Sequence, residues 1–215
     1  MHVFRNMHAG VKMGFNRSLL KGEAVASFPG SYDLLPALAN KVLDKNLKPL
    51  PQNLHDTAWW VSQNWGLLAH PAPDAKARAA RLRFTEAQIM HSRAFLERIR
   101  APLATVNPNK QLKALTIVGT SRKTIDKAVW ARAGVGGEKP VLVFTDEDFK
   151  SRGIPHRLDD LLVDGDESVT RESATLPAAY GTALNGPREL LTKAFHSAIL
   201  KDGEVMDAVR NFLAL

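Results

Sequence analysis

The second half of the sequence contains four short apolar runs, and they restrict the possible folds more than any other pattern in the chain. Leucine and β-branched residues dominate them, and glycine, proline or acidic residues bound them, which is typical of strands. The runs lie in LKALTIVG (112–119), PVLVF (140–144), DDLLVDGDESV (159–169) and RELLTKAF (188–195). Strands that follow a helix-rich first half predict a chain that contains both helices and strands.

The first half is predicted to be helical. Proline and glycine interrupt the first 50 residues, so short helices and no sheet are expected there. Asp56 or Thr57 can cap a short helix that runs through Trp65, and Gly66 suits a left-handed position after it. The longest helix is predicted over 74–100, where apolar residues recur at helical spacing among arginines.

A final helix closes the chain in this prediction. Asp202 is its expected cap. Its expected buried stripe consists of Val205, Val209, Phe212 and Leu213. The patterns together predict a helical region over about the first 105 residues, followed by strands and a closing helix.

The composition limits the chemistry and the partners. The 215 residues suffice for one sizeable core, and the net charge of +7 favours phosphate-bearing partners such as anionic lipid headgroups or nucleic acid, between which charge alone does not choose. The absence of cysteine excludes disulfides, thiolate metal sites and a cysteine nucleophile. Residues 1–20 lack the apolar run of a signal peptide, and no stretch is long and apolar enough for a membrane span. The chain is therefore expected to be soluble or peripheral.

Two residues stand where catalytic groups of an α/β enzyme are expected. Asp166 lies in an acidic glycine turn after one predicted strand, and His196 follows another strand 30 residues later. Functional groups gather at the carboxyl ends of such strands, and hydrolases of this class place the acid before the histidine in the chain. An ordinary surface turn and an unrelated histidine would give the same pattern.

Several segments resemble the lecithin:cholesterol acyltransferase-like family of α/β-hydrolases, in the order found in that family. They are RNMHAGVKMGF (5–15), SFPGSYDLLP (27–36), LTIVGTSRKT (115–124), VDGDESV (163–169) and FHSAIL followed by VMDAVRNFL (195–213). The resemblance implies that Asp166 is the acid and His196 the general base of a Ser-Asp-His triad. Glu167 and Ser168 replace the Gly-Thr that the family usually has in this turn.

The resemblance also implies a fold of the α/β class, a partial α/β-hydrolase that acts on a lipid or another acyl ester. In this interpretation 1–108 form a connector and helical cap, or lid, and 109–215 form the C-terminal part of the hydrolase core. The family's GxSxG elbow, which carries the nucleophilic serine, does not occur in the sequence. An N-terminal half with the serine is thus the expected partner, an anionic membrane surface is a second one, and nucleic acid is not expected. This chain alone is expected to be inactive. No metal site is predicted, because the histidines are scattered, and no cofactor is expected.

Other residues allow two interpretations. Ser121 follows a strand, but its loop lacks the second glycine of an elbow, which favours a polar loop at the pocket border. Trp59, Trp60 and Trp65 form either a membrane-interface or acyl-binding patch or the core packing of a cap helix. Gly134–Gly137 is expected to form a flexible hairpin. A non-enzymatic basic helical module, which binds anionic membranes or nucleic acid, and an inactive truncated gene product remain the alternatives.

Overall fold

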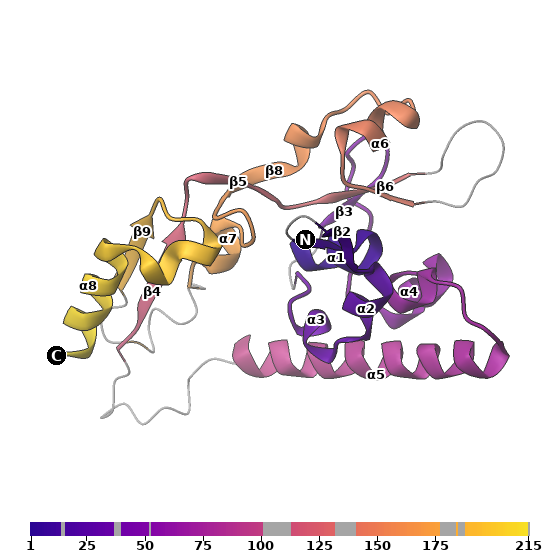
Figure 1. Ribbon diagram of the computed structural model, residues 1–215, viewed down its shortest axis with the longest axis horizontal. Coiled ribbons are helices and arrows are strands. Elements are labelled where there is room, and N and C mark those ends of the chain that lie inside the picture. The colour runs from indigo at the N-terminus through magenta and orange to yellow at the C-terminus, as the bar shows by residue number, and fades with distance from the viewer. Residues whose placement is uncertain are drawn as a thin grey trace. The chain divides into compact units, whose positions relative to one another are not determined.

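The computed structural model shows a mixed helical and stranded protein with several small sheets (Figure 1). It describes residues 1–13, 16–36, 40–51, 53–100, 113–131, 141–176, 184 and 188–214. The predicted hairpin at Gly134–Gly137 lies outside these ranges. In the described part of the chain, no helix is long and apolar enough to cross a membrane.

Helices dominate the first half and recur between the strands of the second. The α-helices are α1 His2–Ala9, α2 Gly22–Ser27, α3 Pro29–Asp33, α4 Thr57–Gln63, α5 Ala75–Arg100, α6 Asp146–Ser151, α7 Arg171–Ala174 and α8 Gly203–Leu213. The 3-10 helices are η1 Gly66–Ala69, η2 Leu158–Leu161 and η4 His196–Lys201.

The strands pair in small sheets. They are β1 Val11–Met13, β2 Asn16–Leu20, β3 Val42–Leu43, β4 Leu115–Gly119, β5 Arg122–Ile125, β6 Ala128–Ala131, β7 Val141–Val143, β8 Leu162–Gly165 and β9 Arg188–Thr192. All four predicted runs contain a strand. The prediction of no sheet in the first 50 residues is wrong, because β1 and β2 form a hairpin and β3 pairs with the distant β6.

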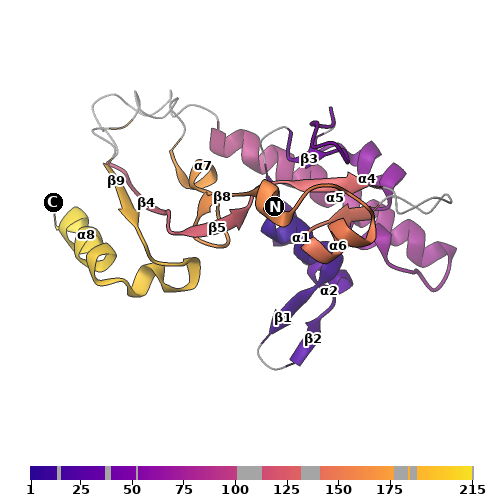
Figure 2. The same cartoon turned by 90° about the horizontal axis from the view of Figure 1, so that it is seen from above.

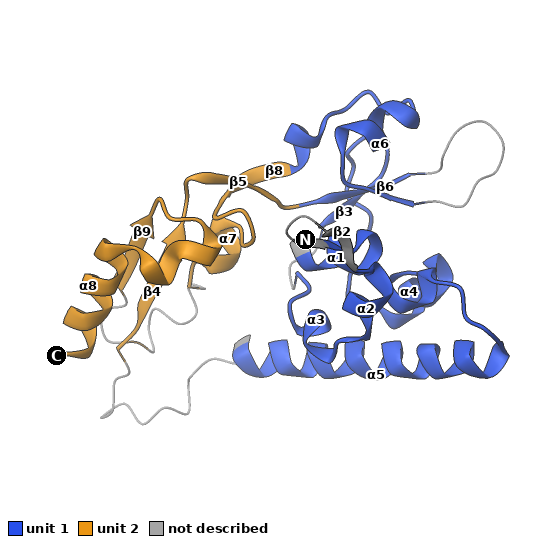
Figure 3. Ribbon diagram, in the orientation of Figure 1, with its two compact units in different colours: residues 1–99, 127–161 blue, residues 100–126, 162–215 orange. Residues whose placement is uncertain are grey.

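The chain divides into two compact units (Figure 3). Unit 1 comprises residues 1–99 and 127–161, and unit 2 comprises 100–126 and 162–215. This division differs from the predicted boundary at residue 108. The reason is that residues 127–161 supply β6 and β7, and β6 pairs in parallel with β3 of the first half.

Unit 1 contains an aromatic core around α4. Asp56 caps this helix as predicted, since its side chain accepts a hydrogen bond from the Ala58 amide. The helix ends earlier than predicted, at Gln63, because Asn64 adopts the left-handed conformation. Gly66 is also left-handed, and a Cβ there would lie 2.6 Å from the ring of Trp60, so only glycine lets the chain pass over the indole.

A second apolar cluster in unit 1 surrounds the β3-β6-β7 sheet. The antiparallel β6–β7 ribbon and the parallel β3 present one face to α6 and the segment that follows it. The buried members are Leu43, Val129, Ala131, Val143, Phe149, Ile154 and Leu161. This cluster explains why residues 127–161 belong with the first half of the chain.

The long helix α5 matches the predicted range of 74–100 and packs on the rest of unit 1 through a narrow face. Ile89 is fully buried, and the Ser92 hydroxyl donates to the Tyr32 carbonyl at 2.7 Å. Ile99, one of the apolar residues that recur at helical spacing in the predicted range, is 51% exposed. The buried face of α5 is therefore shorter than the predicted stripe.

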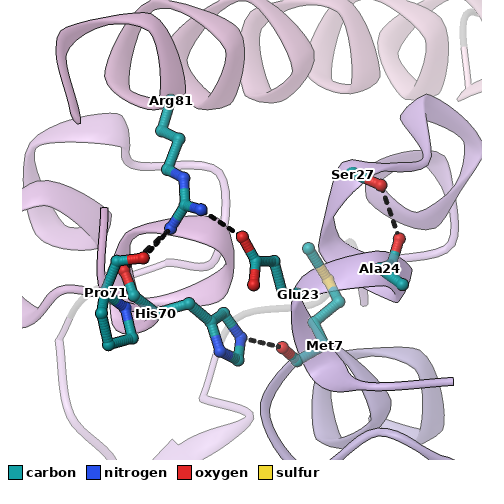
Figure 4. A network of polar contacts seen from close by, with 7 residues as sticks. All are labelled: Met7, Glu23, Ala24, Ser27, His70, Pro71 and Arg81. Atoms are coloured by element: carbon teal, nitrogen blue, oxygen red, sulfur yellow. Dashed lines mark hydrogen bonds and ion pairs between the residues drawn. The ribbon is translucent and has the colours of Figure 1, made fainter. Parts of the chain in front are cut away.

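Arg81 links α5 to the N-terminal helices (Figure 4). Its guanidinium donates to the carbonyls of His70 and Pro71, each at 2.9 Å, and also contacts the Glu23 carboxylate of α2. The His70 ring in turn donates to the Met7 carbonyl at 3.4 Å. The basic face of α5 thus includes at least one arginine with a structural role.

His8 is a second link in this region. Its Nδ1 donates to the Phe4 carbonyl at 2.9 Å, and its Nε2 accepts from the Gly66 amide at 3.4 Å, so the ring must be neutral to make both contacts. The pKa of His8 is lowered to about 4, mainly by burial; the hydrogen bond to the Phe4 carbonyl opposes the shift, and nearby His70 adds a smaller lowering.

Unit 1 is therefore expected to lose stability as the pH falls from 6.5 towards 4. In this window the unfolded chain binds a proton at His8 that the folded chain does not bind, and the loss amounts to at most about 3 kcal/mol. All four tryptophans lie in unit 1, so urea unfolding followed by tryptophan fluorescence measures this unit. His8→Gln should flatten the pH dependence, and an equal dependence in both proteins would contradict the assignment.

Unit 2 contains two strand pairs and the C-terminal helix. β4 and β9 are parallel over five residue pairs, and β5 and β8 are antiparallel. Figures 1 and 2 show α8 beside β9, the strand against which it packs. Asp202 caps α8 as predicted, by accepting from the Val205 amide at 3.1 Å.

The predicted apolar stripe of α8 is only partly buried. Val205 is fully buried, whereas Leu213 is 76% exposed, so its assignment to the stripe is wrong. Met206 and Leu200 are also exposed apolar side chains in this part of unit 2. Val209 and Phe212 are half-buried, so burial along the predicted stripe decreases from Val205 to Leu213.

Candidate active site

Asp166 and His196 meet in unit 2. The His196 Nδ1 lies 2.9 Å from the Asp166 Oδ2, and the His196 amide donates to the Asp166 carbonyl at 2.9 Å. Asp166 directly follows β8, and His196 begins the 3-10 helix that follows β9. The contact on which the triad hypothesis depends is therefore present, and both side chain and backbone contribute to it.

The turn after β8 orients the carboxylate. The Asp166 Oδ1 accepts from the Ser168 amide at 3.0 Å and from the Val169 amide at 2.7 Å, which leaves Oδ2 for the histidine. A Cβ on Gly119 at the end of β4 would lie 2.4 Å from the Asp166 Cβ. Glycine at that strand end is thus needed for the turn to approach β4 so closely.

The surroundings keep Asp166 ionised at neutral pH. The side chain is only 5% exposed, and burial acts to raise its pKa. The hydrogen bonds from the Val169 amide, the His196 ring and the Ser168 amide more than offset burial, so the pKa of Asp166 lies below its usual range. A carboxylate only accepts hydrogen bonds, so the neutral imidazole must carry its proton on Nδ1.

This tautomer prepares His196 to act as a base. With Nδ1 bound to Asp166, the free lone pair of the neutral ring lies on Nε2. The His196 side chain is 54% exposed, so a reacting group can approach it. A buried acid, an oriented imidazole and an accessible Nε2 are the features that general base catalysis needs from these two residues.

Glu167 occupies a strained backbone position in this turn. The residue adopts φ = 83°, a conformation that favours glycine, and its amide donates to the Thr124 Oγ1 at 2.9 Å. Gly165 has no room for a side chain, because a Cβ there would lie 2.4 Å from the same oxygen. Thr124 of β5 therefore fixes the backbone of the turn, and the positive φ at Glu167 is the strained conformation that results.

Glu167→Gly is expected to stabilise unit 2 by about 1 kcal/mol, because a residue with a Cβ loses about 1–2 kcal/mol in the left-handed conformation and glycine offsets part of that gain by its greater freedom when unfolded. Native-state hydrogen exchange of the Val169 amide measures the effect, since unit 2 has no tryptophan. Ser168→Gly, at a neighbouring position without positive φ, should instead destabilise the unit. Destabilisation by both substitutions would contradict the strain at Glu167.

Ser121 has a different contact from the one that a nucleophile needs. Its hydroxyl donates to the Lys193 carbonyl at 2.5 Å, so its proton points at the backbone of the segment after β9. In the ranges that the structure describes, Ser121 makes no hydrogen bond with His196. This geometry supports the interpretation as a polar loop at a strand end.

The three tryptophans are core residues of unit 1. Trp59, Trp60 and Trp65 are 7%, 0% and 1% exposed, so the interpretation as an exposed membrane-interface patch is wrong. The rings of Trp59 and Trp65 lie 4.3 Å apart, and Trp65 also contacts Trp130 of β6 at 5.2 Å. Burial of these rings against one another favours the alternative of core packing.

The sequence patterns did not point to the residues that hold the Asp166–His196 dyad in place. Thr124, Gly119 and Gly165 all act through contacts between segments that only the strand pairing brings together. The register of β5 and β8 places Thr124 opposite Val163, close to the acidic turn. A strand predicted over 122–125, paired with the strand before the acidic turn, would have placed Thr124 near Asp166.

Unit 1 contains a separate hollow of about 640 Å³ between α5 and the segment before α4. Its lining consists of Pro51, Asn53, His55, Asp56, Thr57, Ala58, Ile89, Met90 and Arg93. Neither member of the dyad lines it. In the described ranges, no three His, Asp or Glu side chains gather in a way that could hold a metal ion.

Comparisons with known proteins add no family to this geometry. No protein-family model matches the chain, and no curated protein matches its sequence. The chemistry of unit 2 must therefore be inferred from the dyad itself.

Proposed function

We propose that this chain supplies the acid and the base of a Ser-Asp-His triad in a lipid acyltransferase or esterase. The observation that carries the proposal is the 2.9 Å contact between the His196 Nδ1 and the buried, ionised Asp166. The order of acid and base along the chain and their positions after strands agree with an α/β-hydrolase of the lecithin:cholesterol acyltransferase-like kind. The distance also weighs against the non-enzymatic alternative, which needs no contact between these residues.

In the proposed reaction a serine attacks the carbonyl carbon of an acyl ester. His196 takes the serine proton on Nε2 and passes it to the leaving alcohol, and the acyl group remains on the serine. Water or an acceptor alcohol then attacks the acyl-serine, with His196 as the base again. Asp166 stabilises the imidazolium in both steps and holds its orientation.

The serine must come from outside these 215 residues, because the sequence contains no GxSxG elbow. We propose that it belongs to the N-terminal half of a hydrolase sheet. Among the described strands β4 pairs only with β9, so its other edge is the place where a strand of that half would add to the sheet.

The test is complementation with an N-terminal half of a lecithin:cholesterol acyltransferase-like hydrolase that carries the elbow. The mixture should hydrolyse p-nitrophenyl esters, and each part alone should not. A fluorophosphonate probe should label the elbow serine of the partner and leave this chain unlabelled. Labelling of Ser121 would overturn the assignment of the nucleophile, and a mixture that stays inactive although the two parts associate would overturn the proposed function.

A further inference from the structure

Arg122 lies beside both segments that carry the members of the dyad. It is the first residue of β5 and lies opposite Gly165, the residue before Asp166. Its guanidinium carbon lies 5.4 Å from the ring centre of Phe195, the residue before His196. The same arginine therefore adjoins the segment of the acid through strand pairing and the segment of the base through its side chain.

Strand alternation places Arg122 on the face of the dyad. Side chains two residues apart on a strand share a face, so Arg122 and Thr124 point to the same side of β5. Thr124 binds the Glu167 amide of the acidic turn, which identifies that side as the one facing the dyad. Lys123 points to the opposite side, where it forms an ion pair with Asp164 at 3.0 Å.

The charge of Arg122 is not neutralised within the described part of the chain. The residue is exposed and has no carboxylate partner there, whereas Lys123 does. The contact with Phe195 is a cation–π contact, which uses no hydrogen-bond acceptor, so the guanidinium N–H groups remain for a ligand. Phe195 is 41% exposed, so the cation and the ring form an accessible surface directly beside His196.

We propose that Arg122 binds a phosphate group of the acyl-ester substrate and thereby determines specificity at the dyad. A guanidinium presents parallel donors that match the oxygens of phosphate, and the ring of Phe195 fixes its orientation. An ester with a phosphate near the acyl group would thus place its carbonyl close to His196. The identification of the anion as part of the substrate rests on the proposed function, whereas the anion site itself does not.

The site can be tested on the isolated chain by NMR, without any activity. Inorganic phosphate, added at constant ionic strength, should shift the amide signals of Phe195 and His196 in a saturable way. Arg122→Gln should weaken this binding at least about tenfold, because a charge-assisted pair is lost. Lys123→Gln, which removes the same charge at the next position and on the other face, should bind like the wild type.

Phosphate from a lipid is distinguished from free phosphate by a second titration. Short-chain phosphatidylglycerol below its micellar concentration should shift the same signals, and an uncharged monoacylglycerol should not. Equal binding to the wild type and Arg122→Gln, or equal losses in the variants of Arg122 and Lys123, would overturn the site. If inorganic phosphate binds and phosphatidylglycerol does not, the assignment of the bound phosphate group to the substrate is overturned.

The outcome is separable from that of the complementation test. Phosphate binding lost in Arg122→Gln, with an inactive complemented mixture, would support the anion site and refute the triad. An active mixture in which Arg122→Gln retains the wild-type preference for anionic over neutral esters would support the triad and refute the specificity role of Arg122.

Discussion

Asp166→Asn is expected to lower kcat of the complemented enzyme by about 10⁴-fold, the effect of the same exchange in well-studied serine enzymes. The side-chain oxygen of asparagine can still accept from the Ser168 and Val169 amides, so the turn should persist. The amide group towards His196 would then donate rather than accept, which favours a proton on Nε2. The imidazole is left without a lone pair for the serine proton.

His196→Ala should abolish the activity of the mixture, since no other base contacts Asp166 in the described part of the chain. The double variant should lose no more than the more impaired single one, because groups that act as one unit are not additive. The substitution Ser121→Ala is the matched control and should leave kcat unchanged, since among the described residues its hydroxyl donates only to the Lys193 carbonyl. Residual activity within tenfold of the wild type in Asp166→Asn, with the fold intact by circular dichroism, would refute the assigned role.

The meeting of Asp166 and His196 could be predicted because its signals are local in the sequence. Each residue follows a short apolar run that is recognisable by composition, and the order of acid and base selects one known arrangement. The cap of α8 at Asp202 and the range of α5 were predictable for the same reason. A cap or a helical period depends on residues within one or two turns.

The division into units could not be predicted from local patterns. β3 has only two residues, and its pairing with β6 joins segments more than 80 positions apart in the sequence. The role of Thr124 could not be predicted for the same reason, because its hydrogen bond to Glu167 joins residues 43 positions apart. The conformation of Glu167 could not be predicted for a different reason: a glutamate gives no local indication of the positive φ that the turn imposes on it.

The tryptophans were ambiguous because an indole suits both a core and a membrane interface. Its apolar body gains from burial in either place, and its N–H needs one partner. In Trp60 that partner is the Leu54 carbonyl, which accepts from Nε1 at 2.6 Å. For Trp60 this internal partner removes the need for contact with water. The Trp65 Nε1 is buried without a partner in the described part of the chain, so its ring contacts alone favour the core position.

Trp60→Ala is therefore expected to destabilise unit 1 by about 3–5 kcal/mol, the range for removal of a large aromatic side chain from a packed core. The ring is fully buried and lies within 6.0 Å of the rings of Phe4, Tyr32 and Trp65. Its removal leaves a cavity at the centre of this cluster and an unpaired Leu54 carbonyl. Such a loss is a large fraction of the stability of a typical domain, about 5–15 kcal/mol.

Urea unfolding followed by the fluorescence of the three remaining tryptophans measures the loss. Trp60→Phe keeps most of the ring but lacks the N–H, so its smaller loss separates packing from the hydrogen bond to Leu54. Neither variant should change the partitioning of folded protein onto vesicles of phosphatidylcholine and phosphatidylglycerol, because Trp60 has no exposed surface with which to touch a membrane. A loss of stability below 1 kcal/mol in Trp60→Ala together with weaker vesicle binding would restore the interfacial role and contradict the core position.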